Sequence, residues 1–269
     1  MTKLQLSKLH ATGNDFLVRL ALEPDAEFLS PELAVALCDR HRGVGADGLI
    51  TVLPGRDGAD CTMELRNADG GPAEMSGNGI RTLAWVAARA GLGTADALIV
   101  DTQAGRRTVD LVRNQAGDVT YATVDMGAVT IGETGVVIAV HGTDYRGDVA
   151  SVGNPHFVCF VDDPATTRVT THGPIIERNE RFPNRTNVEF VRVADSETVE
   201  MRVWERGAGE TLSCGTGACA AAAVAHSHGF VGRCPHVRVL GGELAVALDE
   251  TVRLGGPVVH VFDLELELP

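Results

Sequence analysis

The chain repeats a short glycine-framed segment at a distance of 138 residues. EMSGNGIR at positions 74–81 reappears as LSCGTGAC at positions 212–219, with Ser76 aligned to Cys214. The same shift aligns Gly77 with Gly215, Gly79 with Gly217, Gly91 with Gly229, Asn67 with Glu205 and Gly71 with Gly209. Short glycine motifs also recur by chance, but a match that includes a turn, a helix and its end predicts two similar halves. A looser echo, GNDF at 13–16 and GNPHF at 153–157, supports this division.

The hydrophobic pattern predicts many strands and few helices. Ser30-Pro31-Glu32 is typical of a helix start, an N-cap before a first-turn proline. Two more helices are expected at about Gly77–Ala90 and Gly215–His228, each followed by a glycine. Alternating or β-branched residues predict strands at Lys3–His10, Gly48–Leu53, Cys61–Arg66, Ala97–Thr102, Val119–Met126, Phe157–Val161, Val188–Val193, Val199–Trp204 and Val258–Leu268. We expect one half at 1–125, a second at 126–259 and a C-terminal strand, about 260–269, that returns to the first.

Composition restricts the classes of partner. A chain of 269 residues with 44% hydrophobic residues can bury a full core, and its formal charge of −13 opposes binding to nucleic-acid phosphates. No segment approaches the length of a membrane span, and the N-terminal MTKLQLSKLH lacks the apolar core of a signal peptide. The sequence therefore predicts a cytoplasmic protein that acts on a small molecule, without nucleic acid or membrane as partner. Without a secretory signal, the six cysteines are expected to be free thiols.

Both repeated turns place their key residue where a helix begins. The first backbone N–H groups of a helix have no partner within it, and glycines let another molecule approach the main chain, so each turn attracts an anion. The helix dipole stabilises thiolate over thiol, so we expect a lowered pKa for Cys214. Two facing turns of this kind could clamp one carboxylate and present its neighbouring carbon between Ser76 and Cys214.

Two other interpretations of the turns stay open. On its own, Cys214 could be a small buried hydrophobic residue in a tight turn. A phosphate-binding loop is the second alternative, although neither turn carries the Gly-Lys-Ser/Thr of a P-loop.

Six segments together resemble the diaminopimelate epimerases, which belong to the cofactor-independent amino-acid racemases. They are HATGNDF at 10–16, DRHRGVGADG at 39–48, RNADGGPAEMSGNGIR at 66–81, GNPHFV at 153–158, RTNVEF at 185–190 and VWERGAGETLSCGTGACA at 203–220. The resemblance covers nearly the whole chain, and the last segment is highly specific. It implies an α/β (α+β) fold of two pseudo-symmetric halves. Each would be a curled, mostly antiparallel sheet or barrel around a central helix, with the active site in the cleft between them.

The resemblance implies inversion of one α-carbon, which interconverts LL- and meso-diaminopimelate in the biosynthesis of lysine and peptidoglycan. In the family, one cysteine as thiolate removes the α-proton and a second as thiol delivers a proton to the opposite face. Cys214 matches the second cysteine, but Ser76 stands in place of the first. A hydroxyl is a far weaker acid than a thiol, whose pKa is about 8.5, so impaired activity is expected. Two explanations stay open: a cysteine at position 76 has been replaced, or a natural Ser/Cys pair has altered chemistry. The lack of a compensating His or Lys nearby favours replacement.

Further residues match the family's substrate contacts. Arg206 resembles the group that holds the far carboxylate, Glu205 would take the ammonium, and His156 would support the reacting end. The polar anchors are matched by Asn14, Asn67, Asn154 and Asn187, and the amides that clamp the near carboxylate by Gly77, Asn78, Gly215 and Thr216. Each has a structural alternative: the Gly-Asn turns could need asparagine only for their shape, Glu205-Arg206 could be a solvated pair, and His156 could pack at a strand end. Many family members carry glutamine in place of Gly48, so one distal contact is in doubt.

No cofactor or metal is expected. A pyridoxal phosphate enzyme needs a Schiff-base lysine, and only Lys3 and Lys8 exist, both on the expected first strand. The one candidate metal cluster consists of His226, His228, Cys234 and His236. Its spacing fits no standard zinc pattern.

Two alternatives to an epimerase of diaminopimelate stay open. One is a homologue that binds a diamino diacid without turning it over, and the other is a racemase of another amino acid. Arg206 argues against the latter, because a ligand without a second carboxylate would leave its charge unpaired. The family also suggests a homodimer.

Overall fold

The structure is a computed structural model that describes residues 2–23, 26, 28–73 and 75–268. The chain forms two compact units, one built from Met1–Val124 together with Gly256–Pro269 and the other from Asp125–Gly255. It leaves the first unit within strand β8 (Val119–Gly127) and returns within β18 (Val252–Pro257).

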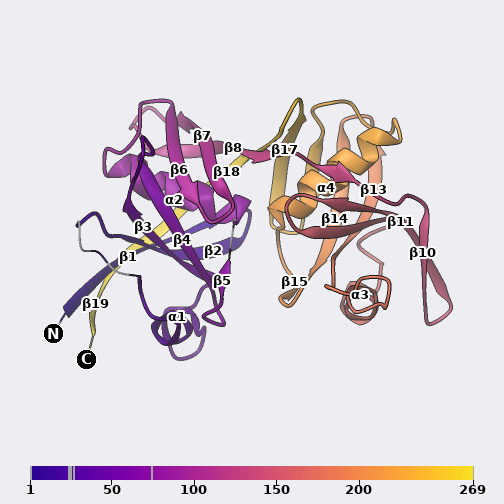
Figure 1. Cartoon of the computed structure of the whole chain (residues 1–269), viewed down its shortest axis with the longest axis horizontal. Helices are drawn as coiled ribbons and strands as arrows, with labels where there is room; N and C mark the ends of the chain where they lie inside the picture. The colour runs from indigo at the N-terminus through magenta and orange to yellow at the C-terminus, as the bar shows by residue number, and fades with distance from the viewer. Residues whose placement is uncertain (1, 24–25, 27, 74, 269) are drawn as a thin grey trace. The chain divides into compact units, whose positions relative to one another are not determined.

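The first unit is a curled sheet around one long helix (Figure 1). Its further elements are β1 (Thr2–Ala11), β2 (Asn14–Leu20), α1 (Pro31–Cys38), β3 (Gly48–Pro54), β4 (Cys61–Asn67), β5 (Pro72–Ala73), α2 (Gly77–Arg89), β6 (Ala97–Thr102), β7 (Gly105–Arg113) and β19 (Val259–Leu268). Most neighbours pair antiparallel, including β1 with β19, so the C-terminal strand belongs to this unit. β2 with β3 and β4 with β6 pair in parallel, since a helix connects the members of each pair.

The second unit repeats this order. Its elements are β9 (Thr130–Ile131), β10 (Val136–Val140), β11 (Thr143–Ser151), β12 (Pro155–Phe160), α3 (Val169–Glu177), β13 (Asn187–Asp195), β14 (Thr198–Glu205), β15 (Gly209–Glu210), α4 (Gly215–Ser227), β16 (His236–Val239) and β17 (Gly242–Leu248). β12 pairs in parallel with β13 across α3, and β14 with β16 across α4. The order from β1 to β8 therefore matches that from β11 to β18, and the two similar halves are a property of the fold.

Helices α2 and α4 form the centres of their units. Every residue from Gly77 to Ala88 is buried, so α2 has no face open to water over that length. In α4, small buried residues at Ala218–Ala222 let the surrounding strands approach closely. A helix that is buried all round belongs to a core, and Figure 1 shows each of these helices within the curve of its own strands. The predicted class, an α/β fold with a curled sheet around a central helix in each half, is confirmed.

Helix α3 was not predicted, because its local sequence disfavours a helix. Arg168 at its N-cap makes no side-chain cap hydrogen bond, and Gly173 and Pro174 lie inside it. A Cβ at Gly173 would lie 2.6 Å from Cβ of Trp204, so the glycine lets the helix pack directly on that ring. Tertiary packing rather than helix propensity therefore holds α3.

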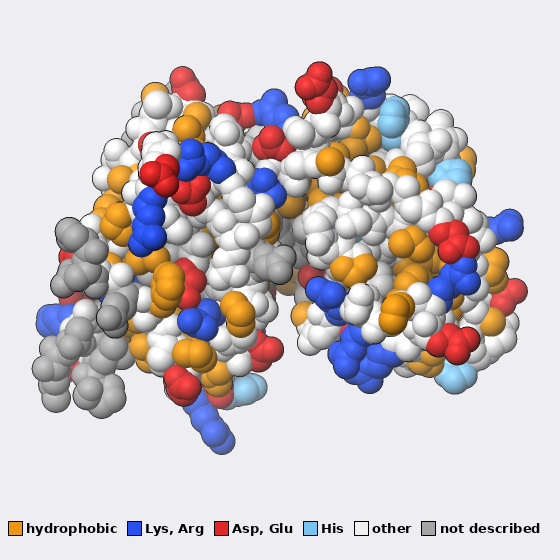
Figure 2. Space-filling view, viewed as in Figure 1, with side chains coloured by type: hydrophobic (Ala, Val, Ile, Leu, Met, Phe, Trp, Pro, Cys, Tyr) orange, Lys and Arg blue, Asp and Glu red, His pale blue; other side chains and the backbone are white. Residues whose placement is uncertain are grey.

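On the face shown in Figure 2, acidic, basic and apolar side chains are interspersed on each unit. Opposite charges form surface ion pairs, such as Arg106 with Asp101 at 2.8 Å. Among the helices of the described residues, none has both the length and the apolar character needed to cross a membrane.

Candidate active site

The first repeated turn is the N-terminus of α2. Ser76 has extended backbone angles, φ −139° and ψ 119°, and its Oγ accepts a hydrogen bond from the Gly79 amide at 3.0 Å. This is N-cap geometry, in which a side-chain oxygen satisfies one amide of the first helical turn. Ser76 is partly exposed, so a ligand can reach its hydroxyl and the helix start behind it.

A fully buried arginine supports this turn from within the helix. Arg81 donates through Nη1 to the Gly77 carbonyl at 2.9 Å and through Nη2 to Asn78 Oδ1 at 2.8 Å. Asn78 Nδ2 in turn donates to Asn14 Oδ1 at 3.1 Å, and Asn14 Nδ2 donates to Asp47 Oδ2 at 2.7 Å. Three predicted site residues are thus joined in one hydrogen-bonded chain. Arg81 and Asp47 were not among the predicted site residues, although both lie inside the segments that resemble the family.

The second repeated turn is the N-terminus of α4 and has the same backbone form. Cys214 has φ −119° and ψ 112°, and its Sγ accepts a hydrogen bond from the Gly217 amide at 3.3 Å. Thr216 Oγ1 lies 3.5 Å from the same sulfur. Unlike Ser76, Cys214 is only 4% exposed.

The expected lowering of the Cys214 pKa is wrong for the protein as it stands. Burial raises the pKa of the Cys214 thiol well above its usual value, and the nearby Glu205 and Glu189 carboxylates raise it further. Hydrogen bonds from Thr216 and Gly217 lower the pKa by less. The helix start is therefore outweighed by desolvation and negative charge, and Cys214 is a neutral thiol, the form that donates a proton.

Beneath the second turn lies a buried carboxyl–imidazole pair. His156 Nδ1 is 2.7 Å from Glu189 Oε1, and both side chains are fully buried. His156 Nε2 is 2.9 Å from Asn154 Oδ1, and Asn154 Nδ2 donates to Thr216 Oγ1 at 3.3 Å. The structure thus brings Asn154, His156 and Thr216 together beside Cys214. Glu189 was not among the predicted site residues, although it lies inside the segment RTNVEF.

Three more predicted residues meet at the ends of β13 and β14. Asn187 Nδ2 donates to the Pro155 carbonyl at 3.0 Å, and its Oδ1 accepts from the Arg206 amide at 2.8 Å. Glu205 accepts a hydrogen bond from Thr211, and burial raises its pKa although this bond and one from Cys214 oppose the shift. The interpretation as a solvated surface pair therefore does not describe Glu205, whereas the side chain of Arg206 is exposed.

Asn67 ends β4 as Glu205 ends β14, and its side chain is exposed. Its neighbour across the strands is Gly48, where a Cβ would lie 2.7 Å from the Arg66 carbonyl oxygen and 3.2 Å from the Phe16 ring. This packing has no room for the glutamine that many family members were expected to carry. A substrate contact from Asn67 stays a prediction.

The other cysteines and the histidine cluster serve packing and surface contacts. All six cysteines are free, and burial raises the pKa of Cys38 to about 11 and of Cys61 to about 12. Three histidines of the candidate metal cluster have separate partners: His226 with the Val231 carbonyl, His228 with Asp148, and His236 with Glu243. Among the described residues, no group of three or more His, Cys, Asp or Glu is placed to hold a metal.

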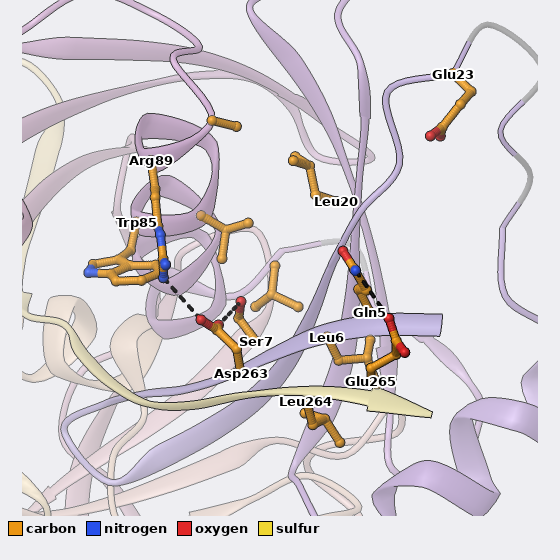
Figure 3. A pocket seen from close by; sticks show the side chains of 13 residues that line it. Gln5, Leu6, Ser7, Leu20, Glu23, Trp85, Arg89, Asp263, Leu264 and Glu265 are labelled. Carbon is orange, nitrogen blue, oxygen red and sulfur yellow. Dashed lines mark hydrogen bonds and ion pairs between the residues drawn. The ribbon is translucent and has the colours of Figure 1, made fainter. Parts of the chain in front are cut away.

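A hollow of about 730 Å³ in the first unit lies beside β1, β19 and the later part of α2 (Figure 3). Trp85 and Arg89, from the later part of α2, line it, and Arg89 pairs there with Asp263. Trp85 follows Ser76 by nine residues, about 13 Å along a helix. The hollow is therefore not a binding site for a ligand held at Ser76.

Comparison with known sequences shows one family. The family model described as diaminopimelate epimerase matches residues 6–132 and 149–260. A diaminopimelate epimerase of Moorella thermoacetica is 42% identical and covers 95% of this chain and 96% of its own. One from Pelotomaculum thermopropionicum is 41% identical and covers 97% of this chain and 98% of its own. One from a Synechocystis strain is 40% identical and covers 98% of this chain and 99% of its own.

Solved structures share the fold at low sequence identity. A predicted epimerase from Pseudomonas aeruginosa has a TM-score of 0.76 and 18% identity and covers 99% of this chain and 100% of its own. A hydroxyproline epimerase from Agrobacterium vitis with bound trans-4-hydroxy-L-proline has a TM-score of 0.73 and 18% identity over 98% and 92%.

Proposed function

The chain belongs to the diaminopimelate epimerase family, a family of isomerases, and we propose that it inverts one α-carbon of diaminopimelate between the LL and meso forms without a cofactor. The observation that carries this proposal is the pair of matching helix caps, with an oxygen at Ser76 and a sulfur at Cys214. Lysine biosynthesis is the route to which such a reaction belongs.

In the proposed reaction, one turn supplies the base and the other the acid. The amides of each helix start, at Gly77 and Asn78 in the first unit and at Gly215 and Thr216 in the second, would bind a substrate carboxylate and stabilise the negative charge that develops on deprotonation. A base on one face removes the α-proton, and a thiol on the other face gives its proton to the same carbon. One proton leaves the α-carbon and another is added to it, so the substrate keeps its composition. The base ends protonated and the thiol ends deprotonated.

The environment of Cys214 supports its role as the proton donor. Its raised pKa keeps the sulfur protonated until a carbanion accepts that proton. A substrate ammonium beside Glu205 would neutralise the carboxylate that holds this pKa up, so binding itself would make the thiol a better acid. Arg206, with its exposed guanidinium, would hold the far carboxylate.

Ser76 makes the opposite half of the reaction slow. A hydroxyl is weaker than a thiol by roughly five pKa units, which is at most about 7 kcal/mol of proton-transfer driving force. We therefore propose that the chain binds diaminopimelate but inverts it slowly, and that a thiol at position 76 restores fast inversion.

The test compares this chain with its Ser76→Cys variant. Epimerisation of LL-diaminopimelate in heavy water is followed by chiral chromatography and by deuterium incorporation at the α-carbon. We expect Ser76→Cys to accelerate inversion at least about a hundredfold. Ser227→Cys, which adds a thiol at the other end of α4, serves as the control and should change nothing. Equal rates in the chain and the Ser76→Cys variant would refute the assignment of residue 76.

The same measurement examines a second candidate function, which Ser76 itself favours. A homologue that only binds a diamino diacid would bind diaminopimelate in calorimetry and incorporate no deuterium, even with Ser76→Cys. The proposed epimerase incorporates deuterium in that variant. A homodimer and a cytoplasmic location are further parts of the proposal, to be checked by analytical ultracentrifugation and cell fractionation.

A further inference from the structure

An unbroken hydrogen-bonded chain leads from a buried carboxyl group to the Cys214 sulfur. Its links are Glu189 Oε1 to His156 Nδ1 at 2.7 Å, His156 Nε2 to Asn154 Oδ1 at 2.9 Å, and Asn154 Nδ2 to Thr216 Oγ1 at 3.3 Å. The last link, Thr216 Oγ1 to Cys214 Sγ, is 3.5 Å. All five residues belong to the second unit.

The donors of this chain point in one direction. Asn154 donates its N–H to Thr216 Oγ1, so the hydrogen of that hydroxyl is left to donate to Cys214 Sγ. Asn154 Oδ1 can only accept, so His156 Nε2 carries a hydrogen. His156 Nδ1 faces Glu189 Oε1 at 2.7 Å, so one further hydrogen lies between these two atoms. Glu189 thereby holds the ring, through Nδ1, in the orientation that presents the Nε2 hydrogen to Asn154.

The position of Glu189 is fixed from several sides. It comes from β13, it is fully buried, and its Oε2 has no hydrogen-bond partner among the described residues. A Cβ at Gly217 would lie 2.7 Å from Glu189 Oε1, so the carboxyl group packs directly against the first turn of α4. The charged or titratable groups that face it are His156 and Cys159 from β12, Glu205 from β14 and Cys214 at the helix cap.

We propose that Glu189 is a positioning residue: it holds His156 in the form and orientation that turn the Thr216 hydroxyl toward the Cys214 sulfur. It acts through the chain and touches no substrate. In the reaction, the hydroxyl supports the sulfur when the proton has left, because a donated hydrogen bond stabilises the thiolate. This role rests on the proposed function of Cys214, but its test measures the thiol alone and needs no epimerisation.

The test compares two variants that both remove the charge of Glu189. In Glu189→Gln, the side-chain amide can donate to His156 Nδ1 and keep Nε2 protonated, so the chain survives. In Glu189→Leu, of similar volume, the first link is lost. Alkylation of Cys214 by iodoacetamide between pH 7 and 10 is measured by site-resolved mass spectrometry, which separates it from Cys219. We expect Cys214 to react at least about fivefold faster in Glu189→Gln than in Glu189→Leu. Equal rates would mean that Glu189 acts only through its charge or packing, and would overturn the proposal.

A double-mutant cycle locates the effect. Adding Thr216→Val to each variant removes the last link, so the rate ratio of the Gln and Leu variants should fall to about one. A ratio that persists without Thr216 would overturn the proposal. If Glu189→Leu does not fold, Asn154→Ala interrupts the same chain in a partly exposed position and keeps the charge of Glu189. Its Cys214 should react at least about fivefold more slowly than in the unchanged chain, and an unchanged rate would count against the role of the chain.

Discussion

The turns at Ser76 and Cys214 share a backbone but differ in the charges behind it. Both cap a thirteen-residue helix with an extended residue whose side chain accepts a hydrogen bond from an amide three positions later. Behind the first turn lies the buried guanidinium of Arg81. At the equivalent place behind the second turn the chain has Cys219, and the carboxyl groups of Glu189 and Glu205 lie near the cap instead.

This difference fits the two chemical roles that we propose for residues 76 and 214. A positive charge at a helix start favours an anion at residue 76, the form needed in a base. Carboxyl groups and burial keep the proton on Cys214, the form needed in an acid. A duplicated backbone can therefore serve as base on one side and acid on the other, because its charged neighbours are not duplicated.

The largest expected effect is on stability and concerns positions 81 and 219. Arg81→Met should lower the free energy of unfolding of the first unit by about 3 kcal/mol, since two buried acceptors, the Gly77 carbonyl and Asn78 Oδ1, each lose the hydrogen bond from the guanidinium. Cys219→Ala should cost the second unit about 1 kcal/mol, because it removes a single buried atom. Equal costs would show that Arg81 does not support its turn in the way we describe.

Two tryptophans allow the units to be measured separately. Trp85 lies in α2 of the first unit and Trp204 in β14 of the second. Urea titrations followed by fluorescence in a Trp204→Phe background report the first unit, and those in a Trp85→Phe background report the second. Each substitution is compared with its own background.

The second prediction compares two thiols in one chain. In Ser76→Cys, the new thiol should react with iodoacetamide at pH 7 about thirtyfold faster than Cys214, a difference of about 2 kcal/mol. It is partly exposed and lies above a guanidinium, whereas Cys214 is buried beside carboxyl groups. Site-resolved mass spectrometry gives both rates from one sample. Slower reaction at position 76 would contradict the division into base and acid sides.

Much of the fold was predictable, because the repeat aligns the elements of one half with those of the other. The helices at α2 and α4 follow from the glycines and caps of the two turns. Helix α3 was not predicted, because Gly173 and Pro174 disfavour a helix in its sequence. The 138-residue shift nevertheless aligns Pro31, the first residue of α1, with Val169, the first residue of α3. Applied to whole elements and not only to motifs, the repeat predicts the third helix.

The sequence motifs predicted which residues belong to the candidate site, but the contacts between these residues depend on the fold. Asn14 and Asn78, or Asn154 and Thr216, are far apart in the sequence, and parallel pairing of strands across a helix brings them together. The raised pKa of Cys214 was not predictable, because it depends on burial and on carboxyl groups that arrive from other strands. A local rule about helix starts therefore gave the wrong sign.

The third prediction compares the glycines three residues after each cap. Gly217→Ala should lower the free energy of unfolding by about 2 kcal/mol, because the new Cβ would lie 2.7 Å from Glu189 Oε1, which His156 holds in place. Gly79→Ala should change it by less than about 1 kcal/mol, since its Cβ would lie 3.1 Å from both Ile50 Cδ1 and Ser76 Cβ, contacts that a shift of a few tenths of an ångström relieves. Urea titrations with the unit-specific tryptophans provide the values. A larger cost at Gly79 would show that the first turn is the tighter one.

The smallest expected effect tests how Glu205 acts on Cys214. The folded-state pKa of Glu205 is raised, so its contribution to stability is present below its unfolded pKa of about 4.5 and is lost as pH rises through the folded value. Glu205→Gln should therefore stabilise the second unit near pH 7 by about 1 kcal/mol and abolish part of the decline in stability that begins as pH rises above about 4.5. It should also speed alkylation of Cys214 about fivefold, because a carboxylate that raises the pKa of the thiol is gone.

A carboxylate placed at the equivalent position of the first unit shows whether burial determines how strongly such a group slows alkylation of the thiol. Asn67 occupies the place of Glu205 but is exposed, so the carboxylate of Asn67→Asp would be surrounded by water and screened. In the Ser76→Cys chain, Asn67→Asp should slow alkylation at position 76 by less than about twofold. A fivefold slowing there would mean that the position in the repeat, and not the half-buried environment of Glu205, governs the reactivity of the thiol. The proton affinity of each turn would then follow from the duplicated backbone itself, which would contradict the asymmetry that we infer.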